Sequence, residues 1–253
     1  MKKFFMIGLS LGVGFFCVPS YADMQPEAIG TMSFILGEAS VSFDGKKWEP
    51  LHLDDKVFPG GRIRTGPESR CEITLNDGSV LRMDENSIQK LELEKEKKAK
   101  ALQKFSIFLA AGKVWVNARK IVSKNKTFQV HTDKAVCAIR GTTFRVDETS
   151  DRTRVSVHEG QVAAWSSRPG QPEAAPGKQP SISKPRPVTG PHSVSMEKWV
   201  EIINELQQIT IDSRGGYEKK DLDVQGFSKD PWVLWNLRRE KLLRDRENIS
   251  GKK

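Results

Sequence analysis

The sequence predicts a mainly β protein, built as a roll or a solenoid-like stack of strands, with a short helical segment near its end. Three observations support this. Short runs of alternating apolar and polar residues continue from about residue 34 to 165. Turns rich in glycine and Asx residues separate these runs, as at Asp44-Gly45 and Asn76-Asp77-Gly78. A proline-rich stretch follows, and the apolar spacing after it becomes helical.

The first residues resemble an export signal. Lys2-Lys3 precede an apolar run from Phe4 to Val18, whose length is usual for a signal-peptide core and short for a membrane span. Ser20-Tyr21-Ala22 places small residues where signal peptidase cleaves. We therefore expect cleavage after Ala22, which would make the protein periplasmic or secreted. The alternatives are an uncleaved anchor and a lipoprotein attached at Cys17.

Composition bounds the size and the partners of the exported chain. Residues 1–22 contain two lysines and no acid, so their removal lowers the formal charge from +9 to +7. About 231 residues remain, enough for one sizeable domain with an appendage. Both charge signs are interspersed, and nucleic acid is not an expected partner of an exported protein. Weak attraction to anionic envelope surfaces is the expected consequence of the positive excess.

Two cysteines would remain after export, Cys71 and Cys137. Period-2 spacing places each on the apolar face of a strand, Cys71 with Ile73 and Leu75, and Cys137 with Ile139. Two interpretations stay open. They are buried, inert thiols, or they form the disulfide that an oxidising compartment permits if their Cα atoms lie close enough.

Residues 166–192 differ in composition from the β region before them. Seven prolines lie in this stretch, with glycine, serine and lysine between them and hardly any large apolar residue. Such a segment cannot bury a core, so we expect an extended, semi-rigid linker.

Two helices are expected in the C-terminal segment, residues 193–247. The first would begin at Ser195 and end at Gly215-Gly216. Its apolar positions, at helical spacing, are Trp199, Ile202, Ile203, Leu206 and Ile209. The second would begin at Asp230-Pro231, where a capping residue precedes a proline at the first helical position.

Short motifs follow one another through the β region in a definite order. They are Gly45-Lys46-Lys47-Trp48, Leu53-Asp54-Asp55-Lys56-Val57, Gly60-Gly61-Arg62-Ile63-Arg64-Thr65-Gly66, Ser69-Arg70, Asp77-Gly78-Ser79, Gly112-Lys113-Val114-Trp115, Phe128-Gln129-Val130-His131-Thr132, Arg140-Gly141-Thr142 and His158-Glu159-Gly160-Gln161-Val162. Over residues 34–165 this ordered set resembles the FecR domain of bacterial envelope proteins. The resemblance implies a β-solenoid-like fold in the periplasm. A full-length FecR regulator carries an anti-sigma segment and a membrane span before this domain. A signal peptide is expected here instead, so we do not expect the regulator's mechanism to apply.

Arginines in these motifs are candidate clamps for carboxylates. They are Arg64, Arg70 and Arg140. They would bind either an anionic ligand or acids of the chain itself, namely Asp54, Asp55 and Glu159.

The second predicted helix carries the clearest candidate for partner binding. Trp232 and Trp235 lie next to a basic stretch that begins at Arg238 and Arg239. This combination suits a partner groove or a membrane interface. Docking onto the β domain or the first helix is the alternative. If the helix binds a partner, alanine at both tryptophans should abolish envelope association and leave the melting temperature nearly unchanged.

Nothing in the sequence favours catalysis. The four histidines are scattered and none has metal-ligand spacing. There is no nucleophile elbow and no P-loop, so we expect no catalytic residues, no metal and no cofactor. The leading hypothesis is a non-catalytic binding or scaffold protein of the envelope, with an envelope protein as partner. The alternative is an extracytoplasmic signalling component that senses an envelope protein or ligand, and a cell-wall hydrolase is a weaker one.

Overall fold

The computed structural model describes residues 26–95, 103–118, 126–139, 141–167 and 200–250. The prediction of a mainly β protein is confirmed, since most described residues lie in strands. The predicted signal peptide, nearly all of the proline-rich linker and Arg140 lie outside the described residues.

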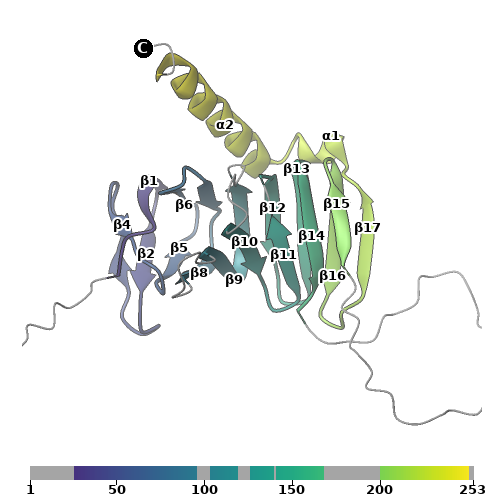
Figure 1. Cartoon of the computed structure of the whole chain (residues 1–253), viewed down its shortest axis with the longest axis horizontal. Helices are drawn as coiled ribbons and strands as arrows, with labels where there is room; N and C mark the ends of the chain where they lie inside the picture. Colours follow the sequence, from purple (N-terminus) through teal and green to yellow (C-terminus); the bar gives the residue numbers. More distant parts are fainter. Residues whose placement is uncertain (1–25, 96–102, 119–125, 140, 168–199, 251–253) are drawn as a thin grey trace, which may run out of the picture.

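The strands form two layers that share one long strand, β9 (Gln103–Asn117) (Figure 1). Sheet A contains, in spatial order, β4 (Lys56–Val57), β1 (Gly30–Leu36), β6 (Arg70–Leu75), β7 (Val80–Met83), the second part of β9, β12 (Thr143–Glu148), β13 (Arg152–Glu159), β16 (Gln207–Asp212) and β17 (Tyr217–Asp221). Sheet B contains β3 (Glu49–Pro50), β2 (Ala39–Ser42), β5 (Arg62–Thr65), β8 (Ile88–Lys95), the first part of β9, β10 (Lys126–His131), β11 (Ala135–Ile139), β14 (Gln161–Ser166) and β15 (Glu201–Asn204). The described strand pairs are antiparallel except for β9 and β10, which run parallel.

One apolar core lies between the two sheets. Alternate residues of each strand enter it, such as Ile73 and Leu81 from sheet A and Ile63 and Leu91 from sheet B. Full burial of an aliphatic side chain of this size stabilises a fold by about 1.5–3 kcal/mol. Period-2 alternation directs the intervening residues outward, and these residues determine what each outer face can bind.

Gly112 marks the point where β9 passes from one sheet to the other. Residues up to Ala111 pair with β8 in sheet B, and residues from Val114 pair with β7 in sheet A. The backbone at Gly112 has φ of +89°, and a Cβ atom there would lie 2.5 Å from Ser87 Cα. Both the backbone conformation and the close approach require glycine.

We expect Gly112→Ala to lower the free energy of unfolding by about 2 kcal/mol or more, because it adds a backbone clash to the cost of a positive φ. Gly60→Ala is the matched control, since Gly60 has φ of +88° with open space around it. Denaturant unfolding of both variants measures the difference. Equal losses would show that the contact with Ser87 is unimportant.

The first predicted C-terminal helix is wrong, because within the described part of its range Glu201–Asn204 and Gln207–Asp212 form strands. Ile203 joins sheet B in β15, while Ile209 and Ile211 enter the core from β16. The apolar residues matched a helical period over a short window, but Ile-Thr-Ile alternation and β-branched side chains favour a strand. The open edges of β14 and β13 accept β15 and β16. Gly215-Gly216 lies in the turn before β17 and ends no helix.

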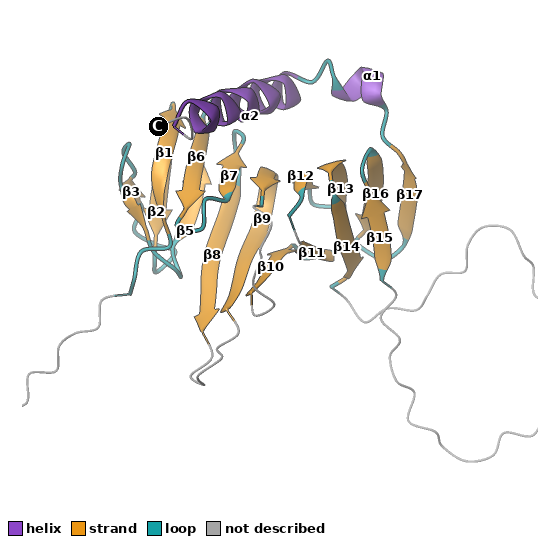
Figure 2. Cartoon of the chain, turned by 45° about the horizontal axis from the view of Figure 1, so that its top comes forward, coloured by secondary structure: helices purple, strands orange, loops and turns teal. Residues whose placement is uncertain are grey.

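The predicted start of the second helix is confirmed. After the short α1 (Val224–Phe227), α2 (Pro231–Ser250) begins where Asp230 Oδ1 accepts a hydrogen bond from the Trp232 backbone N–H at 2.8 Å. The helix lies over sheet A near β1, β6 and β7 (Figure 2). Among the described helices, none combines the length and the apolar character that a bilayer crossing requires.

Candidate functional site

The helix α2 covers a row of outward side chains on sheet A. In register across β1, β6, β7, β9 and β12, the row consists of Phe34, Glu72, Arg82, Trp115 and Arg145. We call it the sheet A row. Its members alternate along their strands with core residues, so β-geometry places them on the face opposite the core. The sheet therefore presents charged and aromatic groups to the helix.

Arg82 lies at the centre of an ion-pair ladder between the sheet and α2. It is 0% exposed. Its Nε donates to Glu72 Oε2 and its Nη1 donates to Glu240 Oε1, both at 2.6 Å. Arg239 of α2 donates to both oxygens of Glu72, at 2.7 and 2.8 Å. Two cations and two anions thus alternate, which balances charge within a buried site.

Neutral donors complete the surroundings of Glu240. Trp115 Nε1 donates to its Oε1 at 3.3 Å, and Asn117 Nδ2 donates to its Oε2. Asn236, one turn earlier on α2, is buried and its side chain donates to the Trp232 carbonyl at 2.8 Å. Buried carboxylates are tolerated when their oxygens are satisfied in this way.

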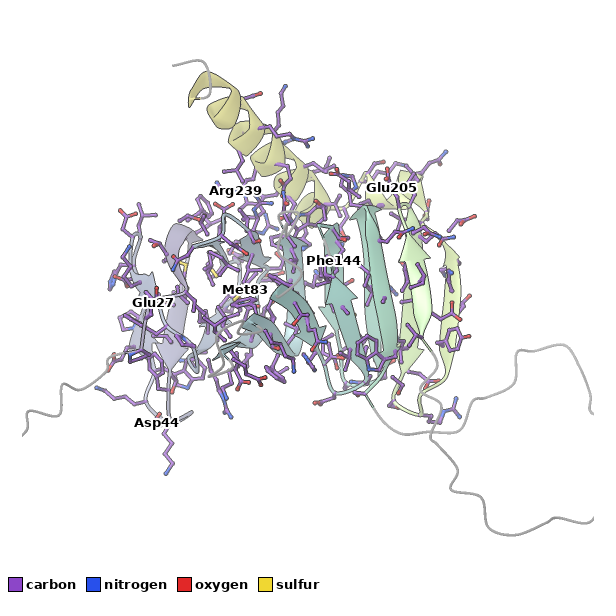
Figure 3. All side chains as sticks on the ribbon, in the orientation of Figure 1. Glu27, Asp44, Met83, Phe144, Glu205 and Arg239 are labelled. Carbon is purple, nitrogen blue, oxygen red and sulfur yellow. The ribbon has the colours of Figure 1, made fainter. Side chains whose placement is uncertain are left out.

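Aromatic rings form the second part of the contact. Trp232 is 1% exposed and stacks on Trp235 with centroids 5.1 Å apart. The Arg70 guanidinium lies 5.3 and 5.4 Å from the two ring centroids, within the range of cation–π attraction. Arg239 lies 4.3 Å from the Phe34 ring, where α2 meets the sheet (Figure 3).

A further ion pair fixes the start of α2. Arg145 Nη1 donates to Asp230 Oδ2 at 2.6 Å, and its Nε donates to Asp147. Burial alone would raise the pKa of Asp230, but hydrogen bonding and the charge of Arg145 hold that pKa below its ordinary value. Asp230 therefore caps the helix and anchors it to β12.

The pKa of Glu72 makes docking of α2 sensitive to acid. Burial alone would raise this pKa, but the hydrogen bonds from Arg239 and the charge of Arg82 lower it from 4.5 to about 2. A carboxylate with a lowered pKa stabilises the folded form above its unfolded pKa, and this contribution is lost as the pH falls through the folded pKa.

We therefore expect Glu72 to lose on the order of 3 kcal/mol of its contribution to folding stability as the pH falls from about 4.5 to about 2, at about 1.4 kcal/mol per pKa unit. Docking of α2 loses the part of this contribution that comes from Arg239, because Arg82 stays beside Glu72 when the helix is released. Tryptophan fluorescence against pH measures this, since Trp232 and Trp235 lie in the contact. Glu72→Gln should flatten the profile in this range, and an unchanged profile would assign the dependence to other groups.

The structure joins two groups of candidates that the sequence left apart. Arg70 meets Trp232, Trp235 and Arg239 around one contact. Trp232 is buried against Trp115 of the β domain. Its position fits the alternative in which the helix docks onto the β domain. Arg238 is exposed. The expectation of an unchanged melting temperature after alanine replacement of the tryptophans does not fit this burial.

The arginine clamps do not pair with the acids expected from the sequence. Arg70 Nε forms an ion pair with Asp84 Oδ1 at 2.9 Å. Arg64 is exposed, donates to Ser40 Oγ at 3.0 Å and lies 4.2 Å from the Trp48 ring centroid. Arg70 therefore pairs with an acid of the chain itself, but this acid is Asp84 and none of the three that were expected.

The two cysteines lie in different sheets and are free, fully buried thiols. Cys71 is in β6 and Cys137 is in β11. Burial raises the pKa of each to about 12, so both are protonated near neutral pH. Of the two interpretations, the structure therefore has buried thiols, and Cys71 and Cys137 do not form a disulfide.

Several residues of the ladder and its surroundings were missing from the sequence candidates. They are Glu72, Arg82, Trp115, Asn117, Asn236 and Glu240. Alternation with core residues indicates that Glu72 and Arg82 point outward, but a charged residue on an outer face is ordinarily solvated. Within the described ranges, no group of three or more His, Cys, Asp and Glu side chains is arranged to hold a metal ion.

Comparison with known proteins identifies the sheet side of this contact. Residues 61–163 match the model of the FecR protein family. The chain carries a FecR domain. The matched residues include Arg70, Glu72, Arg82, Trp115 and Arg145, whereas α2 lies beyond them. The FecR domain therefore provides most of the surface on which α2 docks.

Two crystal structures of a candidate anti-sigma factor from Parabacteroides distasonis, at 1.65 and 2.50 Å resolution, are also similar to this chain. Their TM-scores are 0.43 and 0.42, and both are 18% identical in sequence. Each match covers 65% of this chain and 61% of the other, which is less than two thirds of that protein's length. No curated protein matches the chain.

Proposed function

We propose that the protein is an extracytoplasmic signalling component, in which the FecR domain senses an envelope protein or ligand and α2 reports the event. The FecR match over residues 61–163 is the observation that supports this function. No observation favours a passive scaffold over it. The proposal includes export after removal of residues 1–22, a solenoid-like stacking of the turn–strand units and a non-catalytic role.

The chemistry of the α2 contact suits an element that can be released. Its apolar part is a cluster separate from the main core, formed by Trp115, Trp232 and Val233 with the partly buried Phe227, Trp235 and Leu237 packed against them. Ion pairs and hydrogen bonds join it, such as those of Arg82 and Arg239, and polar contacts are usual where two parts of a protein separate and rejoin. Release of α2 would leave the core between the sheets intact. A ligand that binds the released form more tightly would shift the equilibrium toward it.

The solvent side of α2 offers a second contact. Arg238, Lys241 and Arg244 are exposed there, and Leu242 is 56% exposed. Exposed cations next to an apolar side chain suit weak attachment to an anionic membrane surface. This contact would hold the reporter helix near the envelope in either state.

Crosslinking in intact cells under several growth conditions tests the signalling function. The wild-type protein should capture an envelope partner only under some conditions. Glu240→Lys places a second cation against Arg82 and should release α2, so this variant should capture the same partner under all of them. Asp245→Lys is the matched control on the exposed side of α2 and should behave as wild type. Equal capture by the wild-type protein under all conditions would support a scaffold instead.

A further inference from the structure

The outer face of sheet B carries a row of side chains that matches the sheet A row in arrangement. In register across β5, β8, β9, β10, β11 and β14, its members are Arg62, Lys90, Phe108, His131, Val136 and Trp165. We call it the sheet B row. Core residues precede or follow each member along its strand, such as Ile63, Leu91 and Ile107. The row therefore points away from the core, and the described contacts of α1 and α2 are with sheet A.

The row has a basic end and an apolar end. Arg62 is exposed and forms no ion pair among the described residues, while Lys90 pairs with Glu92 at 2.5 Å. At the other end Phe108, which is 37% exposed, stacks on His131 with centroids 4.7 Å apart. Burial and the charge of Lys104 lower the pKa of His131, so its ring is neutral near neutral pH.

Small and apolar side chains extend the apolar end. Ala138 and Ala163 are half-buried beside the row and leave its surface flat, and Ile202 on β15 is largely exposed. Val136 is only 8% exposed, so the apolar groups that reach solvent at this end are Phe108, Ile202 and the half-buried Trp165. Apolar groups gathered on one outer face mark interaction sites.

The sheet A row shows how this fold accepts a helix. There α2 crosses the strands and satisfies a row that mixes aromatic and charged groups. Five steps between neighbouring strands, at about 4.8 Å each, give the sheet B row a length of roughly 24 Å. A helix of about 16 residues has the same length.

We propose that the sheet B row binds an amphipathic helix of a partner protein, with acidic residues over Arg62 and apolar residues over Phe108 and Trp165. Charge complementarity selects this occupant at the basic end, because Arg62 is exposed and forms no ion pair among the described residues, whereas Lys90 already pairs with Glu92. The inference rests on the proposed function, for which it names the sensing surface and the class of partner.

Photocrosslinking from the row tests the inference in the cells that make the protein. Benzoylphenylalanine replaces Phe108 in one variant and Phe43, which is 62% exposed and outside the row, in the control. Position 108 should capture a segment of another protein whose mapped sequence has acidic and apolar residues at helical spacing. Arg62→Glu should lower the yield at least about fivefold, and Arg62→Lys should preserve it.

Four results would overturn the inference. They are capture of a second copy, of the chain's own residues 168–199, of lipid, or of nothing above the yield at position 43. Suppose that the crosslinker at position 108 captures no acidic helix, while Glu240→Lys still makes partner capture independent of growth conditions. The signalling function is then supported, and the sheet B row is rejected as the sensing surface. If position 108 captures an acidic helix equally under all conditions, the surface stands and the signalling function fails.

Discussion

Replacing Arg82 with methionine is expected to destabilise the docked form of α2 by about 3–5 kcal/mol, the usual cost of breaking a buried ion pair. Methionine keeps most of the volume, so the loss reports the missing charge and hydrogen bonds. Glu72 would keep Arg239, but Glu240 would keep only neutral donors, Trp115 and Asn117. Denaturant titration followed by tryptophan fluorescence measures the loss.

Arg64→Met is the matched control for this substitution. Arg64 also stacks on a tryptophan, but it is exposed and lies on sheet B. Exposed positions away from buried networks usually change stability by less than about 0.5 kcal/mol. Adding Glu240→Gln to the Arg82→Met protein should recover part of the loss, because it removes the unpaired charge. If Arg82→Met costs no more than Arg64→Met, the ladder does not hold α2.

Local patterns were sufficient to predict most of the β fold and the start of α2. Alternation identified runs such as Val114-Trp115-Val116, and Asp230-Pro231 has the expected capping geometry. The pattern failed at Ile202-Ile203, where a short apolar run fits either period. These residues form strands because they pair with the open edges of β13 and β14. Those edges lie far away in the sequence, so a short stretch of residues does not reveal them.

The site was harder to predict because its chemistry joins distant parts of the chain. Arg82 and Glu240 are 158 residues apart, and Glu72 and Arg239 are 167 apart. The sequence identified Arg70 and the two tryptophans by residue type, since arginine and tryptophan are common at contacts. It did not identify Glu72 or Arg82, because only the helix that covers them distinguishes them from ordinary surface charges.

Trp232→Ala is expected to cost about 3–5 kcal/mol, the usual loss for truncating a buried tryptophan. The ring is buried and stacks on Trp235, so truncation leaves a cavity between α2 and Trp115. Leu242→Ala is the control, because Leu242 is on the same helix and 56% exposed, and it should change stability little. An unchanged melting temperature for Trp232→Ala would instead indicate that Trp232 serves as a contact for a partner.

Combining Trp232→Ala with Arg82→Met distinguishes loss of docking from unfolding of the sheets. If α2 is released as a unit, the stability lost by the double variant cannot exceed the free energy of docking. The double variant should therefore lose less stability than the sum of the losses in the two single variants. Proteolysis between β17 and α2 should then be fast, while the core between the sheets still unfolds as in the wild-type protein. Full additivity with loss of the sheets would instead show that α2 is an inseparable part of the fold, and a releasable reporter helix would be excluded.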